Sequence, residues 1–297
     1  MATSSSSLQL LQAEVDPTGE KDSYLRLLHD NKHIKYVAIA PGLYSSHDMC
    51  FTPTITALLN PLFPPGIWNY GYVNKDPETG LPHFAEVAQK EFSGVSNAWH
   101  STKVDYLDLV LGGKLMSGVY DATCSQFATP LVAKFACWDW EIGYMEDECT
   151  AYQWIEGYNI GPKFLGHITE DGRVIGFLME RVTDETGDAR HATPADLEVC
   201  QQALAKLHNL GILHGDLVKY NILITNKGAT LIDFSEARES DDILASEEER
   251  KILETELRSD SDRGRPGGRF LEGRTLERYV AADDGVLKTP CPADDPE

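Results

Sequence analysis

Hydrophobic and polar positions follow a regular pattern after the first third of the chain. Short apolar runs separated by glycines predict strand, turn and strand across 104–124, and a third short strand across 129–138. Residues 140–156 have the apolar spacing of a helix, and residues 162–182 predict two strands joined by a tight turn. This order predicts a small antiparallel sheet with one helix packed against it.

A helix and a hairpin follow this sheet. Thr193 can cap the helix, and Pro194 and Asp196 suit its first turn, where the dipole favours an anion. Apolar residues then recur at helical spacing, and Gly211 is a natural stop. Further along the chain, ILIT and TLID flank the turn residues NKG, which predicts a β-hairpin.

Three polar residues surround the hairpin. Asn221 precedes its first strand and Asp233 follows its second, so both lie at the open end of the hairpin. Asp216 is five residues upstream of Asn221, on the loop that enters this end. Two carboxylates and an amide oxygen are hard ligands that suit Mg²⁺ bound together with substrate phosphates. We therefore predict that the apolar strands hold these three residues in fixed positions, where they form a polar site.

The two ends of the chain carry weaker signals. Residues 1–20 are Ser-rich and predict a disordered tail. Residues 21–100 combine a short helical pattern in SYLRLLHD, a strand-like KYVAIA and a Pro-rich packed loop, and we expect this extension to brace the following domain. Near the other end, Ser246 to Glu249 form a capping box for an acidic helix that ends near Arg258. After it, RGRPGGR reads as a flexible linker, with a phosphate-binding arm as the alternative.

The charge balance limits the partners that we expect. The 297 residues contain 26 basic and 47 acidic side chains, which gives a formal net charge of −21. Such a surface repels phosphate backbones and anionic lipid, so we expect no nucleic-acid partner and no membrane partner. The six cysteines lack CxxC or metal-ligand spacing, and no segment has the pattern of a signal peptide or a membrane span. These features predict a soluble, cytoplasmic protein with reduced thiols.

The spacing around the hairpin resembles a known family. The pattern H-x-D-x-x-x-x-N followed by D-F, from His214 to Phe234, is similar to that of the protein-kinase-like fold. The resemblance implies that Asp216 accepts a hydroxyl proton and that Asn221 and Asp233 hold Mg²⁺. It also implies an α+β, bilobal fold with a small antiparallel N-lobe and a compact, mostly helical C-lobe.

The resemblance continues upstream in the same order. Val132-Ala133-Lys134 is similar to the lysine motif of strand 3, whose ammonium neutralises nucleotide phosphates. The segment from Gly113 to Gly118 resembles a degenerate phosphate loop. We therefore expect ATP and Mg²⁺ as cofactors. The residues expected to contact the nucleotide are Gly113, Gly118, Val132, Lys134 and, after the fifth strand, Met179, Glu180 and Val182.

The glutamate that would pair with Lys134 has three candidates on the predicted helix, Glu141, Glu146 and Glu148. Glu148 begins a stripe of residues at i, i+3, i+4 and i+7, which is the pattern of a buried helix face, whereas Glu146 points away from it. We choose Glu148, and Glu141, near the helix start, stays as an alternative.

Several positions depart from protein kinases. Gly215 replaces the arginine of His-Arg-Asp, giving the His-Gly-Asp of aminoglycoside and other small-molecule phosphotransferases. Ser235 replaces the glycine of Asp-Phe-Gly, and no Ala-Pro-Glu follows. Lys219 lies three residues past Asp216 rather than two, so we interpret it as a solvated surface lysine. The chain is also similar to uncharacterised kinase-like proteins of filamentous fungi.

Together these features predict an ATP/Mg-dependent phosphotransferase that acts on a hydroxyl group of a small molecule. Asp216, Lys134 and Glu148 would be its catalytic residues, acting through proton acceptance, placement and charge neutralisation. A minimal kinase with a protein substrate and a nucleotide-binding pseudokinase that serves as a scaffold stay open as alternatives. The expected division of the chain is a tail at 1–20, an extension at 21–100, a kinase-like domain at 101–258 (N-lobe 101–182, C-lobe 183–258) and a flexible acidic tail at 259–297.

Overall fold

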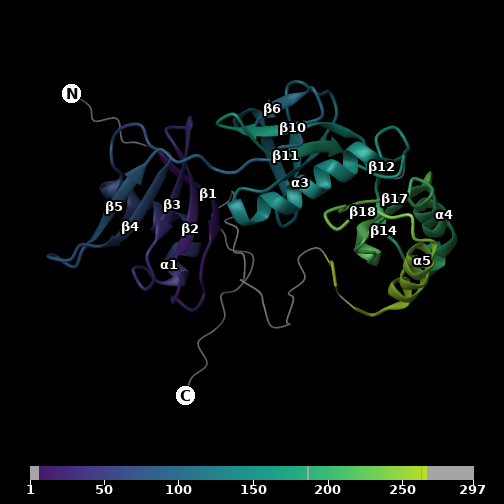
Figure 1. Ribbon diagram of the computed structural model, residues 1–297. Helices are drawn as coiled ribbons and strands as arrows, with labels where there is room; N and C mark the ends of the chain where they lie inside the picture. The colour runs from purple at the N-terminus through teal and green to yellow at the C-terminus, as the bar shows by residue number, and fades with distance from the viewer. Residues whose placement is uncertain (1–6, 186, 262, 266–297) are drawn as a thin grey trace, which may run out of the picture. The chain divides into compact units, whose positions relative to one another are not determined.

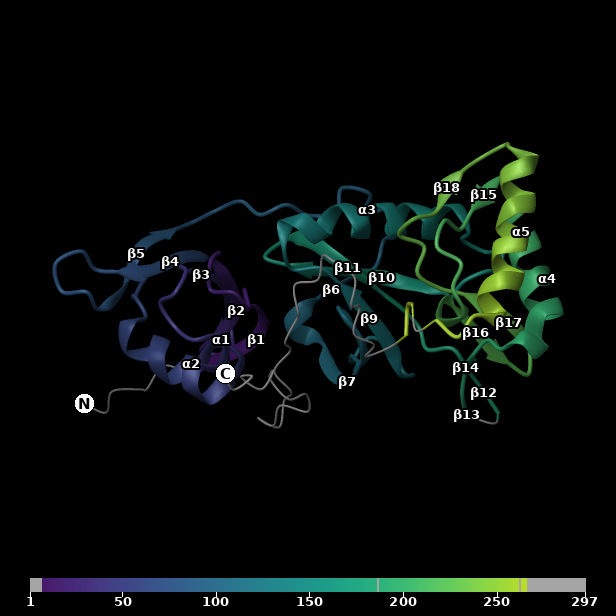
Figure 2. The same ribbon diagram turned by 90° about the horizontal axis from the view of Figure 1, so that it is seen from below.

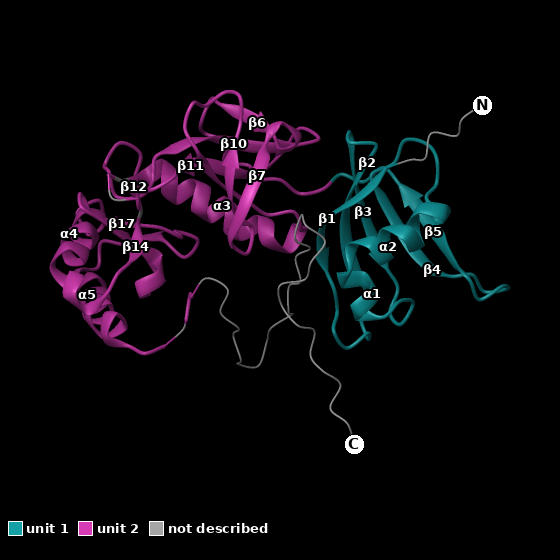
Figure 3. Cartoon of the chain, turned by 180° about the vertical axis from the view of Figure 1, so that it is seen from behind, with its two compact units in different colours: residues 1–91, 271–297 teal, residues 92–270 magenta. Residues whose placement is uncertain are grey.

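The computed structural model describes residues 7–185, 187–261 and 263–265. These residues fall into two compact units, one up to residue 91 and one from residue 92 onward, which Figure 3 colours separately. We expected the boundary after residue 100. It lies earlier because the segment that follows residue 92 is bonded into the second unit: Ser93 N–H donates to Asp139 Oδ1 and Val95 N–H donates to the Val174 carbonyl.

The first unit is a five-stranded sheet with two short helices. The strands pair in chain order and are β1 (Leu8–Glu14), β2 (Ser23–His29), β3 (His33–Ile39), β4 (Tyr70–Lys75) and β5 (Pro82–Ala88). The β3–β4 pair is parallel and the other pairs are antiparallel. The connection between β3 and β4 carries α1 (Ser46–Cys50), α2 (Thr52–Leu59) and the 3-10 helix η1 (Asn60–Leu62).

Two expectations for this unit differ from the structure. The helical prediction for SYLRLLHD is wrong, because this segment forms β2, in which Leu25 and Leu27 point to the same side and are fully buried. The N-terminal segment is also ordered earlier than expected, since LQLLQAE pairs with β2 as β1. In both segments the pairing of neighbouring strands decides the conformation, and single-segment composition does not reveal it.

The second unit begins with a six-stranded sheet in the order β6-β10-β11-β9-β8-β7. Its strands are β6 (Lys103–Asp105), β7 (Val110–Met116), β8 (Val119–Thr123), β9 (Leu131–Phe135), β10 (Phe164–Glu170) and β11 (Arg173–Glu180), with the 3-10 helix η2 (Tyr106–Asp108) after β6. Only the short β6–β10 pair is parallel. The five strands predicted across 104–182 are therefore confirmed as β7 to β11, whereas β6 and its parallel pairing with β10 were not predicted.

One helix packs against this sheet, as the sequence predicted. It is α3 (Asp139–Trp154), which lies along β11 (Figure 1) and buries Ile142, Met145, Cys149 and Tyr152. The side of α3 that carries Glu148 is therefore the side that faces the strands. This arrangement brings a helix carboxylate to the central strands of the sheet.

The rest of the second unit alternates helices and short strands. Helices α4 (Leu197–His208) and α5 (Ile243–Arg258) lie side by side (Figures 1 and 2). Around them are β12 (Thr183–Asp184), β13 (Gly187–Asp188), β14 (Arg190–His191), β15 (Ile212–Leu213), β16 (Ile222–Thr225), β17 (Gly228–Leu231), β18 (Arg238–Glu239) and the 3-10 helices η3 (Pro194–Asp196) and η4 (Lys219–Asn221). The described part of the expected C-lobe is thus mixed α/β rather than mostly helical.

Helix capping agrees with the prediction from the sequence at α4 and differs from it at α5. Thr193 and Asp196 form the capping box that precedes α4. The acidic helix α5 begins three residues before Ser246, because the Asp242 side chain accepts the Leu244 N–H at 2.9 Å and caps it. The predicted β16–β17 hairpin is present, with Ile222 opposite Leu231.

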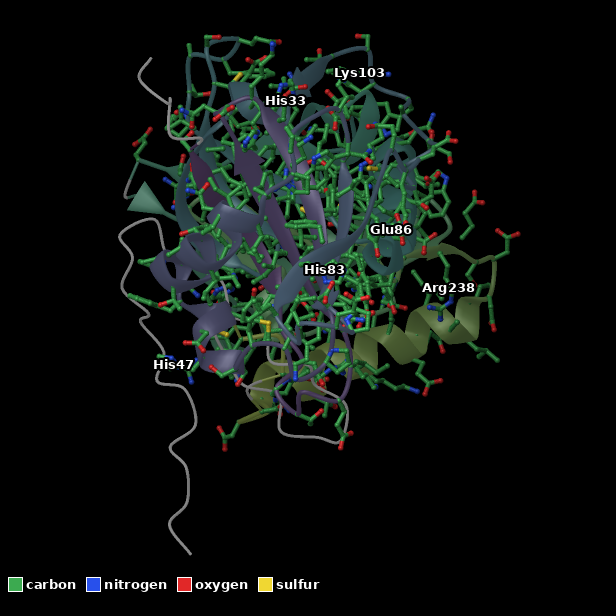
Figure 4. The ribbon with its side chains drawn as sticks, turned by 90° about the vertical axis from the view of Figure 1, so that its left-hand side faces the viewer. His33, His47, His83, Glu86, Lys103 and Arg238 are labelled. Atoms are coloured by element: carbon green, nitrogen blue, oxygen red, sulfur yellow. The ribbon has the colours of Figure 1, made fainter. Side chains whose placement is uncertain are left out.

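Within the described part of the chain, no helix combines the length and apolar character needed to span a membrane. Five cysteines lie there, all buried and none of them in a disulfide, whereas Cys291 lies outside the described residues. Three histidines of the first unit, His33, His47 and His83, come from β3, α1 and β5 and stand apart in Figure 4.

Candidate active site

The ammonium of Lys134 contacts two carboxylates in the second unit. Lys134 lies on β9, and its Nζ is 2.6 Å from Glu148 Oε2 and 2.7 Å from Asp233 Oδ1. Glu148 comes from α3, and Asp233 follows β17. Three segments that are distant in sequence therefore meet at one cation.

The geometry distinguishes the three candidate glutamates of α3. Glu148 is the one that reaches Lys134. Glu146 instead accepts the N–H groups of Ser96 and Asn97 at 2.5 and 2.9 Å, and so fixes the chain that enters the second unit. The Glu141 carboxylate accepts the Cys137 N–H at 3.3 Å. Each of the three carboxylates has a different partner.

Burial and charge have opposite effects on this cluster. Burial alone would lower the pKa of Lys134, but the carboxylates of Glu148 and Asp233 outweigh it and raise that pKa above its ordinary value. Burial would raise the pKa of Asp233, and the Lys134 ammonium lowers it below its ordinary value. For Glu148 burial prevails and the pKa is raised, although Lys134 acts against this. Lys134 is thus a cation and Asp233 an anion at neutral pH.

The aromatic ring of Phe234 fixes the segment that carries Asp233. Phe234 is fully buried, with ring centroids 5.4 Å from Tyr152 of α3 and 5.1 Å from His214. Asp233 itself has a φ of 64°, in the left-handed region that few non-glycine residues adopt. The buried ring next to it holds this backbone conformation and thereby the direction of the carboxylate.

The loop before the hairpin carries Asp216 and Asn221. The Asn221 amide nitrogen donates to the Asp216 carbonyl at 2.9 Å and to Asp216 Oδ2 at 3.2 Å. Asn221 is buried, while 28% of the Asp216 side chain is exposed. His214 is fully buried beside the Ile232 carbonyl, and burial lowers its pKa, so it is a neutral support of the loop rather than a base.

The donor atoms of this loop and of the hairpin end fit Mg²⁺. Asp233 supplies an ionised carboxylate, and because the Asn221 nitrogen is committed to Asp216, its amide oxygen is the atom available to a cation. Mg²⁺ binds through one or two such oxygens together with phosphates and waters. Among the described residues, no cluster of three or more His, Cys, Asp or Glu side chains could hold a metal without such help.

The structure places the expected nucleotide contacts in two groups. Val132 on β9 lies opposite Met179 on β11, and Val119, next to Gly118, lies opposite Lys134. Gly118 has a φ of 69°, and a Cβ there would lie 2.7 Å from the Phe135 carbonyl oxygen. Thus Val132 lies on the lysine strand itself, and Met179 and the turn at Gly118 border that strand.

The remaining expected contacts are Gly113, Glu180 and Val182. A Cβ at Gly113 would lie 3.6 Å from Asp121 Oδ2, and the other oxygen of Asp121 pairs with Arg181. Glu180 is exposed, and the Val182 carbonyl accepts the Ala189 N–H at 3.3 Å. Gly113 thus lies on the edge strand β7, whereas Glu180 is the last residue of the inner strand β11 and Val182 follows that strand.

Gly215 has a structural explanation that the sequence alone did not supply. Its φ is 83°, and a Cβ at this position would lie 2.1 Å from the Glu236 carbonyl oxygen. The arginine of His-Arg-Asp therefore cannot occupy this backbone. Glycine is the residue that allows the loop to pass this close to the segment after Phe234.

Glu249 is a residue that the sequence analysis missed. It lies on α5 and is 7% exposed; its Oε1 accepts the Gly215 N–H and its Oε2 lies beside His208 Nε2, both at 2.7 Å. The sequence analysis assigned it to the capping box of the acidic helix. The signal was its position four residues before Leu253 and eight before Leu257, on the buried face of the helix.

One basic residue from the segment after α5 also reaches the loop. Arg263 Nη2 donates to Asp216 Oδ1. The first arginine of RGRPGGR therefore lies at the site. The last one, Arg269, lies outside the described residues.

Comparison with known proteins gives two findings. Residues 173–254 match the RIO domain, an atypical protein kinase family with a kinase-like fold. The chain is also similar to a probable bifunctional tRNA threonylcarbamoyladenosine biosynthesis protein of Methanothermobacter thermautotrophicus, with 32% identity over 107 residues. That alignment covers 35% of this chain and 19% of the relative, so the chain spans about a fifth of that relative's length.

The matched range has a clear place in the structure. It begins with β11 and ends within α5, so it contains Asp216, Asn221 and Asp233, whereas Lys134 and Glu148 lie before it. The range covers less than a third of the chain. The second unit therefore contains a stretch that is similar to a RIO domain and mixed α/β in structure, as a kinase-like fold requires.

Proposed function

We propose that this protein transfers the γ-phosphoryl group of ATP, with Mg²⁺, to a hydroxyl group. The observation that carries the proposal is the contact of Lys134 with both Glu148 and Asp233, next to the loop of Asp216 and Asn221. The similarity to a RIO domain supports a kinase-like, nucleotide-binding site. Glu148 holds Lys134 in place, and the ammonium neutralises the nucleotide phosphates.

Two further residues hold the metal, and one serves the acceptor. Asp233 and Asn221 would hold Mg²⁺, which would supply positive charge beside the phosphates. Asp216 orients the acceptor hydroxyl and accepts its proton as the new O–P bond forms and the bond between the γ-phosphorus and the ADP oxygen breaks. A positioned base of this kind contributes roughly 10²–10⁴-fold.

The acceptor that we favour is a small molecule. The support is the tripeptide His214-Gly215-Asp216, which resembles that of aminoglycoside and other small-molecule phosphotransferases. In addition, α5 is the last helix of the described residues, so the described part offers little helical platform for a polypeptide. The protein-substrate reading keeps the same nucleotide site and differs in the acceptor.

A second candidate function follows from the relative. Its name refers to tRNA threonylcarbamoyladenosine biosynthesis, and the 32% identity over 107 residues favours a role of this chain in the same process. The net charge of −21 opposes direct contact with tRNA, so such a role would use the nucleotide site through a protein partner. Tight binding of tRNA at physiological salt would argue against this part of the reasoning.

Calorimetric titration with Mg·ATP tests the nucleotide site. The wild type should bind, and Lys134→Ala should weaken binding at least tenfold because the phosphates lose their cation. The matched control is Lys103→Ala, at an exposed position of β6 (Figure 4), which should bind as the wild type does. Equal affinity of Lys134→Ala and the wild type would remove Lys134 from the site.

Labelled ATP then separates the acceptor classes. The protein is incubated with γ-labelled ATP and either a protein-free metabolite extract or the protein fraction of the same lysate. Label in small metabolites supports the favoured reading, and label only in protein supports a protein kinase. Binding of Mg·ATP without hydrolysis or transfer under any condition would leave the pseudokinase reading.

A further inference from the structure

After α5 ends at Arg258, the chain turns back along the loop that contains Asp216 and Asn221, which we call the catalytic loop. Lys219 Nζ donates to the Ser259 carbonyl at 2.8 Å. Two short turns follow, in which the Ser261 N–H donates to Ser259 Oγ at 3.0 Å and the Arg263 N–H donates to Ser261 Oγ at 3.1 Å. We call residues 259–261 and 263–265 the C-terminal strap.

The strap is packed against the loop as well as bonded to it. Gly264 has a φ of 77°, and a Cβ there would lie 2.8 Å from the Cγ2 atom of Val218 and 3.6 Å from the Tyr220 Cβ. Its backbone therefore lies directly on the side chains of the catalytic loop. With the Lys219 bond, this fixes the strap at two points on either side of Arg263.

Arg263 completes the contact at the position where chemistry would occur. Its guanidinium donates to Asp216 Oδ1, while Asp216 Oδ2 accepts the Asn221 amide at 3.2 Å. Both oxygens of the carboxylate therefore have a donor. Arg263 is 56% exposed whereas Asn221 is buried, so an acceptor hydroxyl that approaches Oδ1 from the solvent side meets the Arg263 guanidinium on that oxygen.

We propose that the C-terminal strap is autoinhibitory, with the Arg263 guanidinium occupying on Asp216 the place of the acceptor hydroxyl. The inference rests on the proposed function, because it assigns the acceptor to Asp216. The strap competes with the acceptor, including water in ATP hydrolysis, and leaves the nucleotide contacts at Lys134 untouched. Release of the strap therefore raises turnover without changing the affinity for Mg·ATP.

The contact sets the size of the effect. The ion pair is partly exposed on both sides, and such pairs contribute modestly, so Arg263→Ala should raise the rate of ATP hydrolysis by roughly two- to fivefold. A chain that ends at Arg258 loses the whole strap and should exceed this gain. Arg258→Ala is the matched control: it removes the same charge five residues earlier, from an arginine that pairs with Glu254, and should leave the rate unchanged.

Hydrogen exchange provides a readout that does not depend on turnover. In the full-length protein, Asp216→Asn removes the negative charge that holds Arg263, so the amides of residues 259–261 and 263–265 should exchange faster than in the wild type. Asp241→Asn, an exposed acid beyond the hairpin, is the control and should leave their exchange unchanged. Unchanged exchange in Asp216→Asn overturns the inference.

The two experiments separate failure of the strap from failure of the proposed function. If the wild type hydrolyses ATP and Arg263→Ala is equally fast or slower, the strap is not inhibitory and the inference fails alone. If no form of the chain hydrolyses ATP, the proposed function fails and autoinhibition fails with it, while exchange still decides whether the strap is held by Asp216.

Discussion

Replacement of Lys134 by methionine should destabilise the second unit by an amount that depends on pH. Glu148 is 2% exposed at its side chain, and Lys134 is its ion-pair partner at 2.6 Å. Removal of one partner of a buried pair leaves the other charge uncompensated, which costs about 3–5 kcal/mol. We therefore expect the free energy of unfolding of Lys134→Met to fall by about this amount near pH 8.

The pH dependence follows from the protonation of Glu148. The pKa of this carboxyl is already raised by burial, and loss of the ammonium raises it further. A folded-state pKa above the unfolded-state value means that the folded protein binds more protons, so stability falls as pH rises through this window. Lys134→Met should thus recover much of its stability near pH 5.

Urea unfolding followed by tryptophan fluorescence measures this effect. Four of the five tryptophans, at 99, 138, 140 and 154, lie in the second unit, so the signal reports mainly on it. Lys134→Met/Glu148→Leu is the matched double variant and should be more stable than Lys134→Met at pH 8, because no buried charge is left. A pH-independent loss, or equal losses in both variants, would refute the reasoning.

Three other variants test separate parts of the site and its support. Gly215→Ala should lower the thermal unfolding midpoint, since the φ of 83° at Gly215 and a carbonyl oxygen 2.1 Å from the Cβ position leave no room for a side chain. Gly143→Ala is the control: Gly143 lies in α3 with open space around it, so this change should raise stability by about 0.5–1 kcal/mol. Glu249→Ala should reduce the turnover number at least tenfold with unchanged Mg·ATP affinity, because the Gly215 N–H loses its acceptor. Glu248→Ala, at an exposed position, is the control. Equal turnover numbers for Glu249→Ala and the wild type would contradict the assignment. Burial lowers the pKa of His167 from 6.5 to about 4, so in this pH range the unfolded chain binds a proton that the folded chain does not. Stability should therefore fall by up to about 3 kcal/mol as pH drops from 6.5 to 4. His167→Gln should flatten this part of the curve of stability against pH, measured by urea unfolding.

The sequence predicted the second unit well where local patterns and spacing carry the information. The short apolar runs across 104–182 predicted the strands, and the predicted hairpin placed Asn221 and Asp233 at its open end. The helical stripe of α3 selected Glu148, which does contact Lys134. These elements are defined by residues close together in sequence, so periodicity is enough to find them.

The missed features depend on contacts between distant segments. The segment that forms β2 has a helix-like sequence pattern, and it is a strand because β1 and β3 pair with it on both sides. Glu249 and Arg263 lie 33 and 47 residues after Asp216, and no local pattern indicates that α5 and the strap return to its loop. The need for glycine at 215 likewise arises from the carbonyl of Glu236, which reaches it through the fold.

The most direct test of the central claim is the transfer of labelled γ-phosphoryl from Mg·ATP by the wild type and by Asp216→Asn, with Mg·ATP affinity measured on the same samples. The account predicts that Asp216→Asn loses at least 99% of the transfer or hydrolysis rate, at the low end of general-base effects, and binds Mg·ATP within about twofold of the wild type. Equal rates in the two proteins would contradict the account, because Asp216 would then take no part in the chemistry.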